Sequence, residues 1–323
     1  MLDCWILILL WSLFVFIVTI IIAILIFYFY MSNNIEQICI NALIEKFTEN
    51  VEDSCSMSPV TYREQVYIPN ENGVYEKQLA IALVDIASAT SSANCMSILP
   101  IPNPPGFTNQ LRVEGIDPID HSNRMYAYIF WNPDLHHAVI SFTGTQSWSE
   151  WQSDFQFQQV VPTILNGYQN GVLVHQGFYD IYLAIRNTLW DWWNNNQSWI
   201  QTLYITGHSL GGALSTICGY DFADALSHTN NYPIHYSFGA PRSGNTGYTE
   251  IFNTRLPTSI RINNTEDLVP GLPLATFNGY TYEQTTGNVP FTVSLGSLVN
   301  DHTQAYNDYL PDCPEVARCI ATE

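Results

Sequence analysis

The amino-acid sequence predicts an α/β fold with a mostly parallel central sheet flanked by helices, preceded by one N-terminal transmembrane helix. A β-branched strand runs into a Gly-x-Ser-x-Gly turn at Ser209 and then into a helix, an arrangement found where an α/β sheet presents a serine. A long uncharged run also occupies residues 5–31. We therefore expect a transmembrane signal anchor over residues 1–31, a juxtamembrane linking segment over 32–74 and one α/β domain over 75–323.

The N-terminal run has the length and composition of a membrane-spanning helix. Residues 5–31 carry no charged side chain and would extend roughly 40 Å as a helix, which exceeds the ~30 Å hydrocarbon core of a bilayer. Trp5, Tyr28 and Tyr30 lie near its ends, where aromatic belts occur. A cleaved signal peptide is the alternative, but its basic start and small-residue cleavage site are not evident. We therefore expect an uncleaved anchor and a single-pass membrane protein.

Cysteines and glycosylation sequons are compatible with a lumenal or extracellular position for the α/β domain. Cys218 lies on the predicted helix after Ser209, where we expect a buried apolar thiol. Sequons begin at Asn196 and Asn263. Four other cysteines lie in peripheral segments, where disulfides would tie down the chain. These are Cys55, Cys95, Cys313 and Cys319.

Local patterns place further helices and strands along the chain. Apolar residues recur at intervals of three to four in the segments that we predict as helices. The tripeptide Asn132-Pro133-Asp134 between two apolar runs predicts a hairpin. The expected helices span 35–47, 77–93, 179–193 and 213–226, and the expected strands span 126–131, 138–142, 203–206 and 259–262.

The charge balance restricts the kinds of partner. Ten Lys and Arg residues stand against 29 Asp and Glu residues, so the formal net charge is −19. This excess disfavours nucleic acids and anionic head groups, because like charges repel at contact. Most of the acidic surface is expected to serve solubility. We therefore expect no nucleic-acid partner and favour neutral molecules.

Ser209 is the first candidate for covalent chemistry. A serine on a sharp strand-to-helix turn has its Oγ exposed above the sheet. The flanking Gly207 and Gly211 let neighbouring backbone pass without a Cβ clash. The strand before this turn and the helix after it supply the context that a five-residue motif alone lacks. The pattern predicts Ser209 as a nucleophile.

A serine nucleophile in this topology is followed along the chain by an acid and then by a histidine. Asp267 stands in the polar loop after the predicted strand 259–262, and His302 is the only histidine that follows it. Three other carboxylates are rivals of Asp267. Two of them lie on the helix after Ser209 and point away from its N-terminus, and the third is too close in sequence to His302 to orient its ring easily. The rivals are Asp221, Asp224 and Asp301.

Ser209, Asp267 and His302 would cleave an ester in two steps. His302 would remove the Ser209 proton as Oγ attacks the carbonyl, while Asp267 would hold the imidazole tautomer. The proton then passes to the departing alcohol, and water repeats the cycle on the acyl-enzyme. The developing oxyanion needs N–H donors, which we expect from Leu210 and from an earlier loop at 143–146.

Five motifs in a fixed order make the chain resemble the class 3 lipases, the family of fungal triacylglycerol lipases and diacylglycerol lipases. The likeness covers roughly residues 75–306 and is carried by more than the serine motif alone. It implies an α/β-hydrolase fold. The motifs are Phe142-Thr143-Gly144-Thr145 with Trp151 and Asp154, then Val174–Tyr179, Gly207–Ala213, Phe238–Asn245 and Asp267–Pro270.

The resemblance also implies roles for single residues. It implies catalytic roles for Ser209, Asp267 and His302. Thr145 and Leu210 would then be the oxyanion-hole residues. A lid is implied over residues 147–155, in which three side chains form an apolar stripe and the rest is polar. The stripe consists of Trp148, Trp151 and Phe155.

One position departs from the family pattern. Thr143 stands where the family usually has an arginine that braces the loop by ion pairing. Threonine cannot form an ion pair, although the catalytic set does not require the charge. The departure therefore bears on the rigidity of the loop and not on the class of reaction.

The remaining histidines do not form a recognisable metal site. His136 and His137 are adjacent, so in a strand they would face opposite sides, and no spacing nearby resembles a ligand set. His175 and His208 are expected to make structural hydrogen bonds, and His235 is interpreted as part of a polar loop. We expect no cofactor and no metal.

The sequence therefore predicts a membrane-anchored serine hydrolase that cleaves carboxylic esters of lipids, of the triacylglycerol or diacylglycerol type. A neutral lipid or ester would be the substrate, and the N-terminal helix would anchor the chain in the membrane. A carboxylesterase or a phospholipase is the nearer alternative, because the lid is thin in apolar residues. A non-catalytic binding protein of this fold is the more distant alternative, since all three triad residue types are present.

Overall fold

The fold is taken from a computed structural model. It describes residues 61–69, 73–95, 101–144, 157–163 and 171–310, together with Ile21. Apart from Ile21, the predicted anchor, the predicted helix 35–47 and the predicted lid lie outside these residues. None of the helices in the described ranges combines the length and the apolar character that a bilayer span requires. The described residues from 61 to 310 belong to one compact unit.

Seven strands of the described chain form the central sheet, in the order β1-β2-β3-β6-β7-β8-β11. The strands from β3 to β11 are parallel, and β1 and β2 extend the sheet as an antiparallel edge. This confirms the mostly parallel sheet expected from the sequence. The strands are β1 (Asn109–Ile116), β2 (Asn123–Asn132), β3 (His137–Phe142), β6 (Thr202–His208), β7 (Ile234–Phe238), β8 (Ile260–Asn264) and β11 (Asn288–Phe291).

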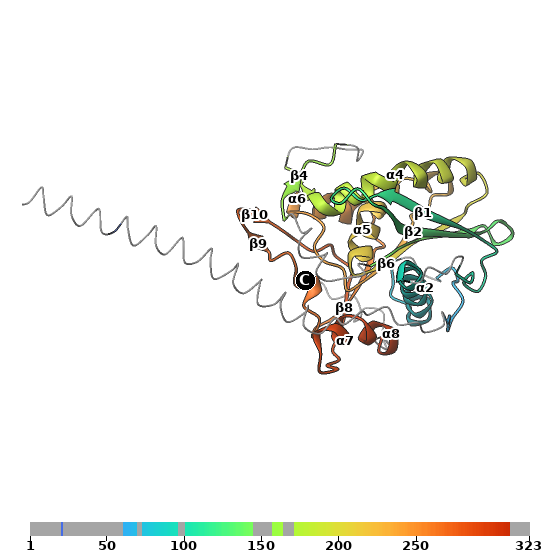
Figure 1. Cartoon of the computed structure of the whole chain (residues 1–323). Helices are drawn as coiled ribbons and strands as arrows, with labels where there is room; N and C mark the ends of the chain where they lie inside the picture. Colours follow the sequence, from blue (N-terminus) through green and yellow to red (C-terminus); the bar gives the residue numbers. More distant parts are fainter. Residues whose placement is uncertain are drawn as a thin grey trace, which may run out of the picture. The chain divides into compact units, whose positions relative to one another are not determined.

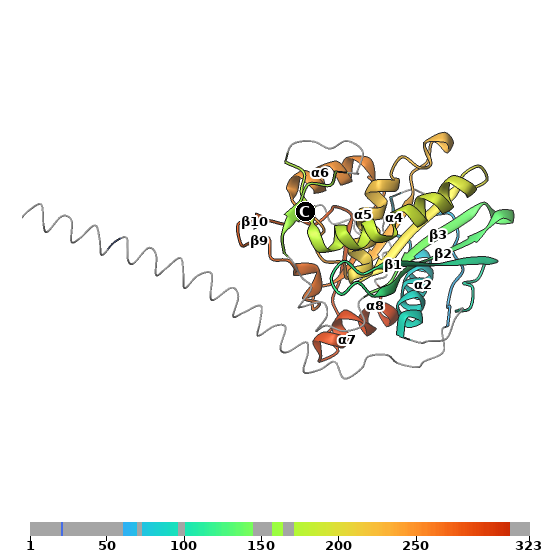
Figure 2. The same cartoon turned by 45° about the horizontal axis from the view of Figure 1, so that its top comes forward.

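Helices cover both faces of the sheet. In Figure 1, α4 and α5 lie on one side of the strands and α2 lies on the other, and Figure 2 shows the same arrangement after a turn. The helices are α2 (Lys77–Cys95), α4 (Gln176–Asn196), α5 (Leu210–Phe222), α6 (Thr246–Arg255), α7 (Leu298–His302) and α8 (Gln304–Asp308). Single turns of 3-10 helix are formed by Pro133–Leu135, Ser227–Thr229 and Val269–Gly271.

Two short antiparallel strand pairs lie outside the central sheet. β4 (Gln159–Val160) pairs with β5 (Val174–His175), and β9 (Thr276–Phe277) pairs with β10 (Tyr280–Thr281). The ring of Phe157 meets that of Phe277 edge-on at 4.7 Å, which ties the two pairs together.

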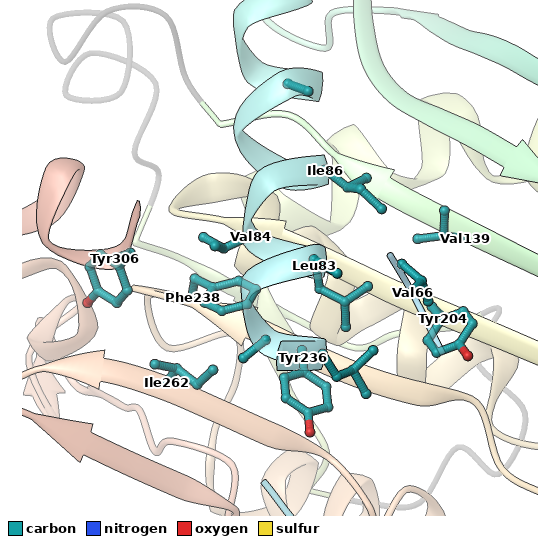
Figure 3. Packing of buried hydrophobic residues seen from close by; sticks show 14 of the residues in the cluster. Val66, Leu83, Val84, Ile86, Val139, Tyr204, Tyr236, Phe238, Ile262 and Tyr306 are labelled. Carbon is teal, nitrogen blue, oxygen red and sulfur yellow. The ribbon is translucent and has the colours of Figure 1, made fainter. Parts of the chain in front are cut away.

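The core on the α2 side is a layer of aliphatic and aromatic side chains. Figure 3 shows Leu83 and Val84 of α2 facing Tyr236 and Phe238 of β7. Each of the two α2 side chains is fully buried, and burial of one such side chain is worth about 1.5–3 kcal/mol. The alanine-rich sequence of α2 favours a helix and lets it approach the sheet closely.

The helices and strands expected between residues 77 and 264 are present, with shifted ends. The clearest difference is the C-terminal end of the helix expected at 213–226, because α5 ends at Phe222. The amide of Ala225 bonds to the carbonyl of Phe222, three residues back, at 2.9 Å. This tighter bonding ends the α-helix where periodicity alone predicted its continuation. Strand β1 was not predicted.

Close backbone contacts fix the turn between β6 and α5. A Cβ at Gly211 would lie 2.8 Å from the carbonyl oxygen of Thr143 and closer still to that of Phe142. A Cβ at Gly207 would overlap the carbonyl of Gly211, and one at Gly212 would lie 2.7 Å from the Cβ of Ala240. Because no side chain fits at these three glycines, α5 begins directly against the ends of β3 and β6.

A buried carboxylate fastens α4 to α5. Asp221 accepts hydrogen bonds from the Tyr182 hydroxyl at 2.6 Å and from the Trp190 indole at 2.7 Å. It also pairs with two nitrogens of Arg186, at 2.7 and 2.9 Å. Burial and the adjacent Asp221 raise the pKa of the Tyr182 hydroxyl, which keeps it a donor.

A second ion pair holds the segment 61–69 against the domain. Arg63 donates to Asp85 of α2 through its backbone amide at 2.7 Å and through its guanidinium at 2.6 Å. The same guanidinium bonds to the carbonyl oxygen of Asn307 in α8. Val66, three residues after Arg63, packs in the core and is 4% exposed. The segment therefore connects α2 with α8.

Replacing Gly211 by alanine should lower the stability of the domain. The new Cβ would collide with two carbonyl oxygens of immobile backbone, and overpacking of this kind costs about 1–3 kcal/mol or more. Thermal unfolding of the full chain measures the change. Gly271→Ala is the matched control, because no heavy atom lies within 4 Å of the added Cβ, and equal melting temperatures for the two variants would contradict the packing argument.

Candidate active site

Ser209 lies at the sharp turn between β6 and α5. Its backbone has φ 60° and ψ −128°, a conformation that costs a non-glycine residue about 1–3 kcal/mol and that the surrounding structure must maintain. The amide of Ser209 donates to the carbonyl of Phe238 at 3.0 Å. Ser209 itself is 7% exposed.

The N-terminus of α5 begins at the residue after Ser209. Leu210 is the first residue of this helix, and the first N–H groups of a helix have no acceptor within it. The amides of Gly212 and Ala213 both turn back to the carbonyl of Ser209, at 2.9 and 3.3 Å. The partial positive charge of the helix end therefore lies beside Ser209, where it favours an anion.

The structure brings Asp267 and His302 together. Oδ2 of Asp267 lies 2.8 Å from Nδ1 of His302, and both side chains are buried. Oδ1 of the same carboxylate accepts the amide of Val269 at 2.9 Å. Because a carboxylate accepts, the bond to His302 places the ring proton on Nδ1 and leaves the lone pair on Nε2 of a neutral imidazole.

Tyr306 completes the set of groups around Asp267, and the sequence did not reveal this role. Its hydroxyl donates to Oδ2 of Asp267 at 2.6 Å and accepts the amide of Asn264 at 3.0 Å. Burial, followed by the charge of Asp267, raises the pKa of Tyr306, so the hydroxyl keeps its proton. The signal in the sequence was the position of Tyr306, four residues after His302. This spacing places the two side chains on the same side of the segment that α7 and α8 form.

His208 connects the serine turn to the His302 segment. Its Nε2 lies 2.6 Å from the carbonyl oxygen of His302, and the two rings are 4.6 Å apart. Burial, and then the neighbouring His302, lower the pKa of His208 to about 3. The neutral ring must carry its proton on Nε2 to donate to this carbonyl. The structural hydrogen bond expected of His208 is therefore confirmed.

The loop after β3 lies against the serine turn. The amide of Thr143 donates to the carbonyl of Tyr126 in β2 at 3.0 Å. A Cβ placed on Gly144 would lie 3.3 Å from the carbonyl of His208 and 3.7 Å from the Cβ of Ser209. Thr145, the predicted second oxyanion residue, and the predicted lid residues Trp148, Trp151 and Phe155 lie outside the described residues.

The sequence matches the family model described as lipase (class 3) over residues 139–277. These residues hold most of β3, the serine turn and Asp267, and the order of the motifs agrees with the geometry. Over this range the chain is similar to the class 3 lipases.

Known proteins that are similar to this chain include a lipase and a phospholipase. The chain is 31% identical over 185 residues to a lipase of Rhizomucor miehei, a match that covers 53% of this chain and 48% of that protein. It is 30% identical over 150 residues to the chloroplastic phospholipase A(1) DAD1 of Arabidopsis thaliana, covering 42% of this chain and 33% of that protein. The chain thus spans less than half the length of these two curated relatives.

A solved structure shows the same fold. A deletion mutant of the Rhizomucor miehei lipase in complex with its propeptide superposes with a TM-score of 0.52 at 21% identity, covering 68% of this chain and 69% of that one. At this identity the likeness concerns the α/β-hydrolase fold alone.

The three rival carboxylates have other partners. Asp301 is buried, and its Oδ1 accepts the amide of Leu295. Asp221 holds α4, as described above, and Asp224 lies 3.7 Å from Arg255. The structure therefore places Asp267, and none of these three, at Nδ1 of His302.

A polar cavity of about 370 Å³ adjoins Asp267 on the side of β8 and the loop that follows it. Arginine, amide and carboxylate side chains line it, which is unsuited to an acyl chain. Its lining includes Arg242, Arg261, Asn263, Asp267, Glu283 and Gln284. Separately, the described residues contain no group of three His, Cys, Asp or Glu side chains that would hold a metal ion.

His235 was wrongly interpreted as part of a polar loop. It lies on β7, fully buried under α5, with Nδ1 2.7 Å from the Ser259 hydroxyl and Nε2 3.1 Å from that of Ser215. Ser215 gives its own proton to the carbonyl of Gly212 at 2.8 Å, so Nε2 of His235 is the donor. The preceding Tyr232-Pro233 hid the strand in the sequence, because proline ordinarily marks a loop.

Replacing His235 by glutamine should flatten the pH dependence of stability. Burial lowers the pKa of His235 to about 3 in the folded chain, whereas the unfolded chain protonates it near pH 6.5. Stability is therefore lost as the pH falls from about 6.5 toward 3, and one such histidine removes about 1 kcal/mol between pH 7 and 5.5.

Urea unfolding of the full chain at pH 7 and pH 5.5 measures this difference. His235→Gln should lose about 1 kcal/mol less than the unmodified chain over the interval. Equal losses in the two proteins would contradict a neutral, buried His235.

Proposed function

We propose that this chain is a membrane-anchored serine hydrolase that cleaves carboxylic esters of lipids, of the triacylglycerol or diacylglycerol type. The observation that carries the proposal is the bond between His302 and Asp267 beside a serine turn that begins a helix. The order of the three residues along the chain agrees with this topology. The match to the class 3 lipase family model supports the same reaction.

The proposed reaction begins with proton transfer from Ser209 to Nε2 of His302. The serine oxygen bonds to the ester carbonyl carbon, and the carbonyl π electrons move onto its oxygen. His302, held by Asp267 and now protonated, gives its proton to the alcohol oxygen as the ester C–O bond breaks. Water then attacks the acyl-enzyme by the same sequence, and the carboxylic acid leaves.

The oxyanion is proposed to bind at the start of α5. The amide of Leu210 is the nearer donor, and the resemblance assigns the second donor to Thr145. One such donor is typically worth 10²–10³ in kcat. Gly144, which precedes Thr145, already lies against Ser209.

Neutral lipid esters are the proposed substrates. The net charge of −19 disfavours anionic head groups, and the Rhizomucor miehei relative is itself a lipase. A phospholipase activity is the second candidate, because the Arabidopsis relative is a phospholipase A(1). A purely binding role is disfavoured, since the Asp267 carboxylate lies at Nδ1 of His302, as the acid of a catalytic triad would.

The membrane anchor and the lumenal or extracellular position are part of the proposal. They are supported by the uncharged run at 5–31 and by the sequon at Asn196, which is partly exposed at the end of α4. The second sequon gives no support, because Asn263 lies in β8 and is 7% exposed. An oligosaccharyl transferase would not reach this side chain in the folded domain.

Hydrolysis of p-nitrophenyl esters of increasing acyl length tests the reaction. The full chain in detergent should turn over these esters, with a rate that rises with acyl length and on emulsified substrate. Ser209→Ala should lose at least about 10³-fold in kcat, because the nucleophile is removed. Its melting temperature serves as the folding control.

The outcomes separate the candidate functions. Turnover confined to short soluble esters would replace the lipase by a carboxylesterase, and release of fatty acid from phosphatidylcholine alone would replace it by a phospholipase. Turnover that survives in Ser209→Ala would reject the serine hydrolase. A folded full chain that shows no turnover would reject it as well.

Alkaline carbonate extraction of membranes from expressing cells tests the anchor. The full chain should stay in the membrane pellet, because a run of this length satisfies a bilayer span. A variant with Ile21→Lys and Ile24→Lys should shift toward the soluble fraction, since a charge at mid-bilayer costs about 2.5–3.5 kcal/mol. Release of the unmodified chain by carbonate would exclude a transmembrane anchor.

A further inference from the structure

His208 is the last residue of β6 and immediately precedes the nucleophile. In the ladder between β6 and β7 it lies opposite Phe238. The next amide along the chain, that of Ser209, bonds to the carbonyl of the same Phe238 at 3.0 Å. The backbone that carries the His208 side chain is therefore fixed to the sheet.

The His208 ring lies on the face of the sheet that α2 covers. Tyr204, four residues earlier in β6, packs in the core on that face, and alternate residues of a strand share a face. There the ring of His208 meets the ring of His302 at 4.6 Å and that of Tyr306 at 5.3 Å. The side chain next to the nucleophile thus contacts the segment that supplies the base.

A hydrogen bond joins His208 to the backbone of His302. Nε2 of His208 lies 2.6 Å from the carbonyl oxygen of His302, which is 94 residues further along the chain. His302 is the last residue of α7, and Thr303 separates it from α8. A carbonyl at the end of a helix needs a donor from outside that helix, and the ring of His208 supplies such a donor.

The imidazole of His302 is in this way held at two points. His208 holds the backbone from which the side chain starts, and Oδ2 of Asp267 lies 2.8 Å from Nδ1. Because the ring is rigid and planar, fixing its root and Nδ1 gives Nε2 a defined place. Asp267 follows β8, whereas His208 belongs to the strand that ends at Ser209. The contact from His208 therefore ties the position of the base to that of the nucleophile.

We propose that His208 is a positioning residue for the general base: through its bond to the His302 carbonyl it sets the place of the His302 imidazole relative to Ser209. This inference rests on the proposed serine-hydrolase function. His208 does not touch the ester. It acts on proton transfer between Ser209 and His302 and leaves ground-state binding of the substrate unaltered.

The test compares His208→Gln with His208→Asn in the full chain. The amide nitrogen of glutamine reaches about as far from the backbone as Nε2 of histidine and keeps the donor, whereas that of asparagine reaches only as far as Nδ1. The two variants therefore differ in whether they can bond to the carbonyl of His302. His235→Asn makes the same change at a second buried histidine, whose bonds go to Ser215 and Ser259.

The measurements are kcat and KM for p-nitrophenyl butyrate, and the rate constant for phosphorylation by diethyl p-nitrophenyl phosphate. In the second reaction the Ser209 oxygen bonds to phosphorus and p-nitrophenolate leaves, so the base is needed once and no deacylation follows. The melting temperature controls for folding. His208→Leu, which approximates the volume of the ring and has no donor, takes the place of His208→Asn if that variant is unfolded.

His208→Asn should lower kcat roughly 10- to 100-fold with KM within about twofold, because a base displaced by about 1 Å transfers the proton poorly. It should slow phosphorylation by a similar factor. His208→Gln should recover both rates to within about threefold of the unmodified chain, since it restores the donor. His235→Asn should leave both within about twofold, because it does not act on the base.

Three results would overturn the proposal. The first is a kcat and a phosphorylation rate for folded His208→Asn within twofold of the unmodified chain. The second is a loss that His208→Gln shares in full or that falls on KM, because the donor to His302 is then not the cause. The third is an equal loss in His235→Asn, which identifies a general effect of a buried substitution. Absence of turnover from the folded, unmodified chain is a different result, since it rejects the serine hydrolase itself.

Discussion

The close approach of three backbone segments at the start of α5 is the constraint on which the rest of the structure depends. Gly207 and Gly211 allow α5 to begin against the ends of β3 and β6, and Ser209 is held at φ 60° between them. The parallel register that pairs Phe142 with Gly207 brings the loop after β3 to the same place. A residue with a side chain at either glycine would separate the helix from the sheet, and the serine, the helix N-terminus and the loop would no longer share one point.

The candidate site combines a small number of charges with several neutral donors. Asp267 is buried, and its negative charge is met by the N–H of Val269, the hydroxyl of Tyr306 and the ring of His302. Burial keeps His208 neutral, so it adds a directed hydrogen bond and no positive charge beside His302. These groups come from the carboxyl ends of parallel strands and from two short helices, which is where an α/β sheet gathers functional side chains.

The sequence revealed those features of the fold that arise from contacts within a short stretch of chain. The serine turn, the hairpin at 132–134 and the long helices have local signals, and the order of Asp267 and His302 follows from the topology. Tyr306 was missed because its role exists only through a partner 39 residues away. His235 was misread for a related reason: a proline two residues earlier disguised a strand that only its neighbours in the sheet define.

The bonds of Arg63 have a mechanical consequence. The segment 61–69 is the first continuous stretch of the described chain, and Arg63 near its start is joined to Asp85 of α2 and to the carbonyl of Asn307 in α8. A force that pulls on the chain ahead of residue 61 is therefore taken first by a multiply bonded ion pair and by the packing of Val66. The strands of the sheet bear load only after Arg63 has released both helices. A domain tethered at its N-terminus would therefore pass tension first to α2 and α8, at the contacts of Arg63.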